Sequence, residues 1–200
     1  MEIERFLEKL SSDTPTPGGG SASALAGALS ASLVAMAAGL SLKKARPKQE
    51  GMKEIRKKAL RIQKKLIRAV DEDAKSYDAV IRAFRLPKNT EEERLRRNKM
   101  IQKAYRGATI TPQLICRHSI QLLDYSRTLI LKGNPNAVSD VGVAAFLADA
   151  ALAGGLLNIG INLIPSTERN FLSRMNLLMR QYGKKRNQLM GKIMNGLKRF

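Results

Sequence analysis

The chain has 200 residues, of which 44% are hydrophobic and 26% charged, so it can form one domain with a substantial buried core. Its single cysteine excludes an internal disulfide and favours a reducing compartment. The first residues lack the features of a signal peptide, and we expect a cytoplasmic protein.

The charge is strongly positive, with 36 basic against 17 acidic residues. Residues 43–68 hold twelve basic and two acidic residues, and residues 167–200 hold nine basic and one acidic. The rest of the chain is nearly neutral. Such a field attracts polyanions, which include nucleic acid, anionic lipid and small ligands with several carboxylates. A solvated surface that serves solubility alone has the same composition.

Apolar residues recur every three or four positions and no segment alternates like a strand, so the sequence predicts an all-α protein. A short helix is expected over 2–11, followed by a glycine-rich loop and a helix over 21–42. The second helix contains eight Ala, five Ser, two Gly and seven larger apolar residues. Its length suits a membrane span, but Ala and Ser contribute little transfer free energy. We therefore predict no membrane span and place this segment at the centre of a helical bundle.

A long helix is expected over 48–86, where Pro87 stops it. Its apolar stripe places Asp73 on the buried seam, and Tyr77 follows one turn later on the same face. A buried carboxylate is costly unless it is paired or used in chemistry. The alternatives are an acid paired with a neighbouring Lys or Arg, and a tyrosine that belongs to the core.

Four further elements complete the expected single domain over residues 1–200. A capping box of Thr90 and Glu93 starts a helix that runs to about 109, and another helix covers 112–131. A loop over 133–140 leads into a small-residue helix over 140–163, and a basic helix covers 168–198. Gly154-Gly155 in mid-helix costs about 1 kcal/mol per glycine relative to alanine, which predicts close packing against the other small-residue helix.

Polar groups gather at the starts of the two small-residue helices. The glycines before Ser21 let another group approach the backbone, and Ser21 and Ser139 are expected to cap their helices. A flexible turn is the alternative at the glycine loop. We expect Cys116 and His118 to be structural, and a single histidine argues against a Cys/His zinc site.

Several motifs occur together in a fixed order, and with them the chain resembles the cyclodeaminase/cyclohydrolase family of folate enzymes. They are the stretches 13–21, 24–29, 70–74, 85–88, 133–144 and 157–163. The resemblance implies an all-helical homodimer with its folate site near the subunit interface. It implies a folate-site loop of Gly18, Gly19, Gly20 and Ser21, and it places in or near the same cleft Asp73, Asn134, Ser139, Asp140, Asn158 and Asn162.

The family's reaction implies hydrolysis of 5,10-methenyltetrahydrofolate to 10-formyltetrahydrofolate, without a metal or cofactor. On this interpretation Asp73 is the base or the electrostatic partner of the cationic substrate. Asp140 binds the pterin or orients water, and Tyr77 donates a proton. Asn158 and Asn162 either hydrogen-bond the pterin or serve the helix itself.

Two alternatives remain for the function. The first is the cyclodeaminase reaction, which expels ammonia from formiminotetrahydrofolate; the absence of a formiminotransferase domain favours the cyclohydrolase. The second is a basic nucleic-acid-binding protein or a non-catalytic family member, which the low aromatic content and the lack of a reading helix do not favour. In a folate enzyme the basic segments can hold a polyglutamate tail.

Overall fold

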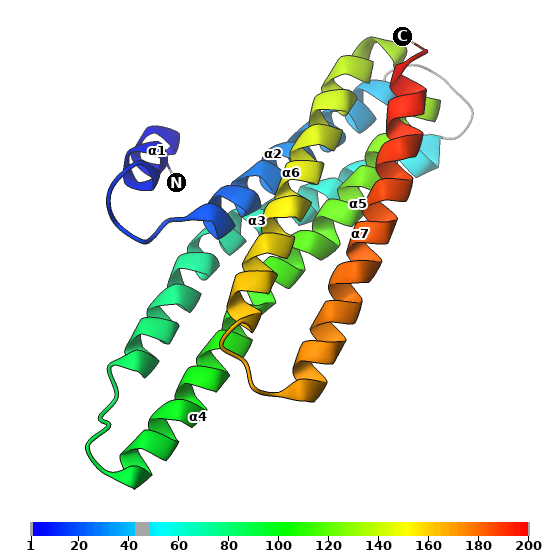
Figure 1. The fold of residues 1–200 in the computed structure, drawn as a ribbon. Helices are drawn as coiled ribbons and strands as arrows, with labels where there is room; N and C mark the ends of the chain where they lie inside the picture. Colours follow the sequence, from blue (N-terminus) through cyan, green and yellow to red (C-terminus); the bar gives the residue numbers. More distant parts are fainter. Residues whose placement is uncertain (1, 43–48, 200) are drawn as a thin grey trace.

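The computed structural model describes residues 2–42 and 49–199, and it contains helices and no strand within those ranges. The all-α prediction is therefore confirmed (Figure 1). The elements are α1 (Ile3–Leu10), α2 (Gly19–Leu42), α3 (Gln49–Phe84), α4 (Glu91–Ala108), α5 (Ile110–Lys132), the 3-10 turn η1 (Pro135–Ala137), α6 (Val138–Leu163) and α7 (Arg169–Leu197). The basic residues of the segment 43–48 lie outside the described part.

The two small-residue helices α2 and α6 run antiparallel at the centre of the bundle. The buried Ser30 hydroxyl of α2 donates to the carbonyl of Ala144 in α6 at 2.7 Å. A side chain at Gly154 would clash with Ser23, and one at Gly155 would lie 2.7 Å from the Cys116 sulfur. Gly154 therefore allows the close packing against α2 that the sequence predicted, whereas Gly155 packs against α5.

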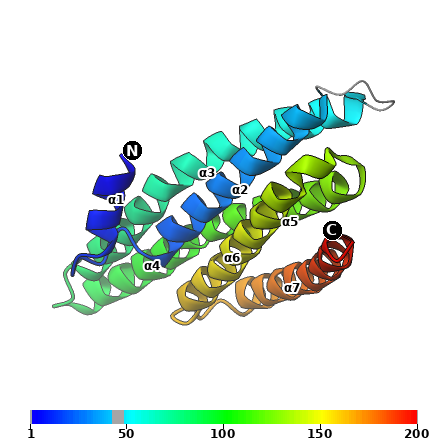
Figure 2. The same ribbon diagram turned by 90° about the horizontal axis from the view of Figure 1, so that it is seen from above.

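The remaining long helices cover one side of this pair and its two edges. α3 and α7 lie on opposite sides of the bundle (Figure 2), and α5 packs against both of them. Arg186 of α7 holds the carboxylate of Asp149 in α6 with two hydrogen bonds, one of which measures 2.6 Å. This ion pair fixes the long terminal helix against the core.

The break between α4 and α5 lies at Thr109, three residues before the expected start of a new helix at Pro112. Pro112 instead occupies the first turn of α5, where its missing N–H costs no hydrogen bond. The predicted capping box is present, since the Thr90 hydroxyl accepts from the Glu93 N–H at 3.2 Å and the Glu93 carboxylate accepts from the Thr90 N–H at 3.2 Å.

Two predicted caps are wrong. α2 begins at Gly19, so Ser21 lies inside its first turn, and its hydroxyl bonds to α3 instead. α6 begins at Val138 after η1, and its N-cap Ala137 offers no side-chain bond. The Asn134 side chain takes the capping role by accepting from the Asn136 N–H at 3.1 Å, and Ser139 is exposed inside the helix.

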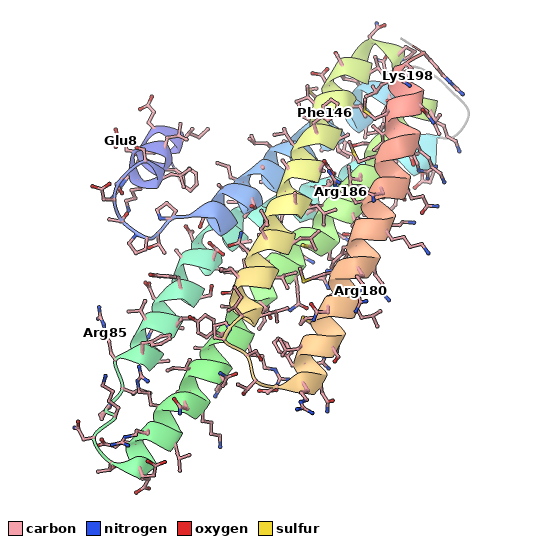
Figure 3. All side chains as sticks on the ribbon, in the orientation of Figure 1. Glu8, Arg85, Phe146, Arg180, Arg186 and Lys198 are labelled. Carbon is pink, nitrogen blue, oxygen red and sulfur yellow. The ribbon has the colours of Figure 1, made fainter. Side chains whose placement is uncertain are left out.

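One side of the α2–α6 pair is apolar and exposed, and we call it the α2–α6 face. The large side chains exposed there are Leu29, Met36, Val143, Phe146, Leu157, Ile161 and Ile164. Figure 3 labels Phe146 on α6 and the basic residues Arg180, Arg186 and Lys198 along α7. By length and composition α2 and the η1–α6 segment could each cross a membrane, a criterion that buried core helices also meet. The face is larger than scattered surface residues explain, which indicates an interaction surface.

Candidate functional site

A cleft of about 400 Å³ opens where the N-terminus of α2 meets the C-terminal part of α6. The glycine loop, α3, α4 and α6 all contribute to it. Its walls include Gly18, Gly19, Gly20, Asp73, Tyr77, Asn158 and Asn162. The structure thus brings together most of the polar residues that the sequence singled out.

Asp73 lies directly against the start of α2. The Ser21 hydroxyl contacts its Oδ2 at 3.2 Å and the Val70 carbonyl oxygen at 2.8 Å. The backbone N–H of Ser21 also donates to the carboxylate. Ser21 is fully buried, so it ties the first turn of α2 to α3 and fixes the position of the acid.

Burial raises the pKa of Asp73 above its ordinary value of 3.8, and the hydrogen bonds from Ser21 only partly oppose this shift. No ion pair of Asp73 with a Lys or Arg is found among the described residues, so the expected alternative of a paired acid does not hold there. A half-buried carboxylate with a raised pKa, facing a cleft, is typical of a functional group.

Gly20 is required by the position of Asp73. A Cβ at Gly20 would lie 2.5 Å from Asp73 Cγ and 2.6 Å from Oδ2, closer than packed atoms come. At Gly19 the nearest atom is Asn158 Nδ2 at 3.9 Å, which is ordinary contact. A side chain is therefore tolerated at Gly19 but not at Gly20.

We expect Gly20→Ala to lower the free energy of unfolding by about 1–3 kcal/mol, because the new methyl displaces the Asp73 carboxylate. Gly19→Ala is the matched control, and a helical alanine there should be neutral or stabilising by up to about 1 kcal/mol. Urea unfolding of both variants measures the difference. Equal stability of the two variants would show that Asp73 does not lie over Gly20.

The amides of α6 face the same cleft. Asn158 donates from Nδ2 to the carbonyl of Gly154 at 2.8 Å, and Asn162 donates to the carbonyl of Ala108 at 3.0 Å. Each side chain thus uses its nitrogen within the protein, which leaves the Oδ1 acceptor for a ligand. The second bond also fixes the end of α4 beside α6.

Asn134, Ser139 and Asp140 lie at the other end of the bundle and do not line this cleft. The Asn134 N–H donates to Ser41 Oγ at 2.9 Å, which places its loop at the C-terminus of α2. A helix of the length of α2, 24 residues, is about 36 Å long. The expectation of one cleft that contains both loops is therefore wrong for a single chain.

Cys116 and His118 lie away from the cleft, on α5 inside the bundle. The thiol donates to the Leu152 carbonyl at 3.8 Å, and burial raises its pKa to about 12. His118 Nδ1 bonds to Gln121 at 2.8 Å. Both residues have structural positions, as expected. No group of three or more His, Cys, Asp or Glu in the described ranges is arranged to hold a metal ion.

Sequence reasoning missed several residues of the cleft wall, namely Pro15, Thr16, Ser76, Val80, Tyr105, Ala108, Ile161, Ile164 and Pro165. Ser76 and Val80 follow Asp73 at helical spacing, so the same face of α3 would have indicated them. Tyr105 carried no such signal, because only the packing of α4 beside α3 and α6 brings it to the cleft. The Tyr105 ring packs edge-on against the Phe84 ring, with 6.2 Å between the ring centroids.

Comparisons with known proteins agree with this fold. The sequence profile of the family described as Formiminotransferase-cyclodeaminase matches residues 2–181. The chain is 38% identical to the methenyltetrahydrofolate cyclohydrolase of Methylorubrum extorquens over 171 residues, which cover 84% of this chain and 82% of that protein.

Longer relatives and a solved structure extend the comparison. The chain is 30% identical to the formimidoyltransferase-cyclodeaminase of Rattus norvegicus over 84% of its own length, and it spans 32% of that protein. The crystal structure of formiminotetrahydrofolate cyclodeaminase from Thermotoga maritima superposes with a TM-score of 0.89 at 23% identity, over 99% of this chain and 96% of that one. The profile match over nine-tenths of the sequence assigns this protein to the formiminotransferase-cyclodeaminase family.

Proposed function

We propose that the protein hydrolyses 5,10-methenyltetrahydrofolate to 10-formyltetrahydrofolate in the cleft at the start of α2. The observation that carries the proposal is Asp73, a half-buried carboxylate held by Ser21 over a glycine backbone. The 38% identity to a methenyltetrahydrofolate cyclohydrolase over most of both chains supports the choice of substrate.

The substrate's reactive carbon lies between N5 and N10 in a cationic amidinium. Asp73 in its ionised form stabilises that cation and accepts a proton from the attacking water. A carbinolamine with a hydroxyl on the former amidinium carbon results. The C–N5 bond then breaks, N5 takes the proton held by Asp73, and the hydroxyl loses its proton to solvent as the formyl group forms. The raised pKa of Asp73 makes the carboxylate a better base than an exposed aspartate.

The other walls of the cleft bind the folate. Tyr77, with 39% of its surface exposed, stands one turn beyond Asp73 and can relay the proton to N5. The free Oδ1 acceptors of Asn158 and Asn162 suit the N–H groups of the pterin. Tyr105 offers an aromatic ring for stacking. The backbone of Gly18–Gly20 shapes the opening.

We propose further that the protein is a homodimer formed through the α2–α6 face. Ile161 and Ile164 belong both to this face and to the cleft wall, so a second copy on the face reaches the cleft. An antiparallel contact of the two α6 helices about Ala150 brings Asp140 of the second copy opposite Gly160, because both lie equally far from Ala150. A twofold arrangement thus returns Asn134, Ser139 and Asp140 to the site.

The polyglutamate tail of the substrate has basic groups beside the cleft. A neighbouring hollow of about 520 Å³ between α3 and α4 shares Ser76 and Ala108 with the cleft and carries Arg82 and Lys103. Both cations are placed to bind the carboxylates of a γ-linked tail.

The cyclodeaminase reaction is the second candidate, favoured by the similarity to the longer relatives. We expect the purified protein to accelerate the loss of methenyltetrahydrofolate absorbance and to release no ammonia from formiminotetrahydrofolate. Both assays are run with mono- and polyglutamylated substrates, and a lower KM for the longer tail supports the basic hollow. Decay at the buffer rate, or ammonia release alone, would overturn the cyclohydrolase proposal.

A further inference from the structure

The described structure has a strongly basic side that the cleft does not use. On α3 the residues Lys58, Arg61, Lys65 and Arg68 follow one another at spacings of three and four, so they share one flank of the helix. We call this flank, together with basic residues of α5 and α7, the basic face. Its members are all exposed, and from α5 and α7 they are Arg117, Arg174, Lys184, Lys185, Lys192 and Arg199.

The three helices are neighbours along this face. α5 packs against both α3 and α7. Burial lowers the pKa of His118 on α5, and the nearby charges of Arg117 and of Lys65 on α3 lower it further. Burial raises the pKa of Tyr182 on α7, and the charge of Arg117 opposes that shift, which places α7 on the other flank. Arg117 thus stands between two rows of basic side chains.

Little negative charge offsets the basic face. α7 contains no Asp or Glu between Arg169 and Leu197. On α5 the carboxylate of Asp124 is taken by Arg127 at 3.0 Å. On α3 only Lys58 has an ion pair among the described residues of the face, with Glu54 at 3.3 Å. The other cations of the face remain available to a polyanion.

The dimensions and chemistry of the face select a duplex nucleic acid. From Arg174 on α7 to Arg199, two residues past the end of that helix, the row runs about 38 Å at the helical rise, close to one turn of DNA at about 34–36 Å. The side around Arg117 also exposes the aliphatic side chains of Ile110, Leu131 and Leu177, but its ten cations outnumber them, whereas a membrane-surface helix presents a broad apolar face. The low aromatic content of 4% gives no platform for unpaired bases.

We propose that the basic face binds double-stranded nucleic acid through its phosphates, without regard to base sequence. Long parallel rows of cations on α3 and α7 contact the backbone, and no helix has to enter a groove. The face lies on the α5 flank of α3, whereas Asp73 points toward α2. Binding is therefore independent of the folate chemistry and does not rest on it.

Fluorescence anisotropy with a labelled DNA duplex of about two helical turns tests the proposal. The affinity should fall linearly with salt on logarithmic axes between about 50 and 200 mM, with a slope of about −0.9 per phosphate bound. Lys65→Gln/Arg117→Gln/Lys185→Gln should weaken binding by about tenfold or more and flatten that slope by about 0.9 for each phosphate that the variant no longer neutralises. The matched control Arg85→Gln/Arg96→Gln/Lys99→Gln removes the same charge from exposed positions elsewhere and should bind nearly as wild type.

Three results would overturn the proposal. They are no binding by the wild type at about 50 mM salt, equal weakening in the two triple variants, and competition by polyglutamate that matches DNA charge for charge. The last would identify an acidic polypeptide as the partner. Circular dichroism and the methenyltetrahydrofolate assay verify that the variants are folded, since none of the six positions lines the cleft.

Discussion

Replacing Asp73 with Asn is expected to lower kcat/KM for methenyltetrahydrofolate by about 10²- to 10⁴-fold, the range that general base catalysis supplies. The amide keeps the shape of the carboxylate but cannot accept the proton of the attacking water or balance the charge of the amidinium. Asp78→Asn is the matched control, since Asp78 is an exposed aspartate of the same helix and should tolerate the change within about twofold. Initial rates of absorbance loss measure both.

The same pair of variants has a pH signature. The pKa of Asp73 is raised by burial, so its active, ionised form is lost as the pH falls through a value above 3.8. The wild-type rate should therefore decline on the acid side with an inflection higher than that of an exposed aspartate. Asp73→Asn should lack that inflection, and Asp78→Asn should keep it. An Asp73→Asn enzyme with the wild-type rate and profile would remove Asp73 from the chemistry.

Mixing two inactive variants should restore activity if two copies share each site. In the proposed twofold dimer, Asp73 of one copy and Asp140 of the other belong to one site, so Asp73→Asn and Asp140→Asn each inactivate both sites of their own homodimer. In the mixed dimer one site carries both substitutions and the other carries neither. After statistical subunit exchange, half of the dimers are mixed, and the activity should return to about a quarter of the wild-type value.

The control for this experiment mixes Asp73→Asn with Gly20→Ala. Both substitutions affect the same half-site, so every site of the mixed dimer retains one of them, and the activity of the mixture should not exceed the mean of the two variants alone. Size-exclusion chromatography with light scattering verifies that the variants are dimers. Failure of the first mixture to regain activity, with exchange demonstrated, would place Asp140 outside the site.

The fold was predictable because the residues that start and stop each helix lie next to it in the sequence. The apolar stripe of α3 ends before Pro87, the capping box begins α4, and the small-residue composition of α2 and α6 indicated their central position. The same stripe indicated Asp73, since its place on the seam follows from spacing alone. These features depend on residues within a few turns of one another.

The features that the sequence did not predict depend on contacts between helices that are far apart in the sequence. The position of Ser21 before a helix predicted an N-cap, but its hydroxyl donates to the carbonyl of Val70, 49 residues away in the sequence. Tyr105 reaches the cleft only because α4 packs beside α3. The two polar loops were expected together, whereas the antiparallel pairing of α2 with α6 puts one at each end. The spacing of residues within one helix carries no information about these contacts between helices.

The two-sided character of α3 has a consequence for how this protein can vary. One flank of the helix presents Asp73 to the glycine backbone of α2, while a different flank carries the row from Lys58 to Arg68. Substitution along that outer row does not touch the packing that positions the acid. In this fold the surface charge of α3 can therefore change, in evolution or by design, while the position of the Asp73 carboxylate stays the same.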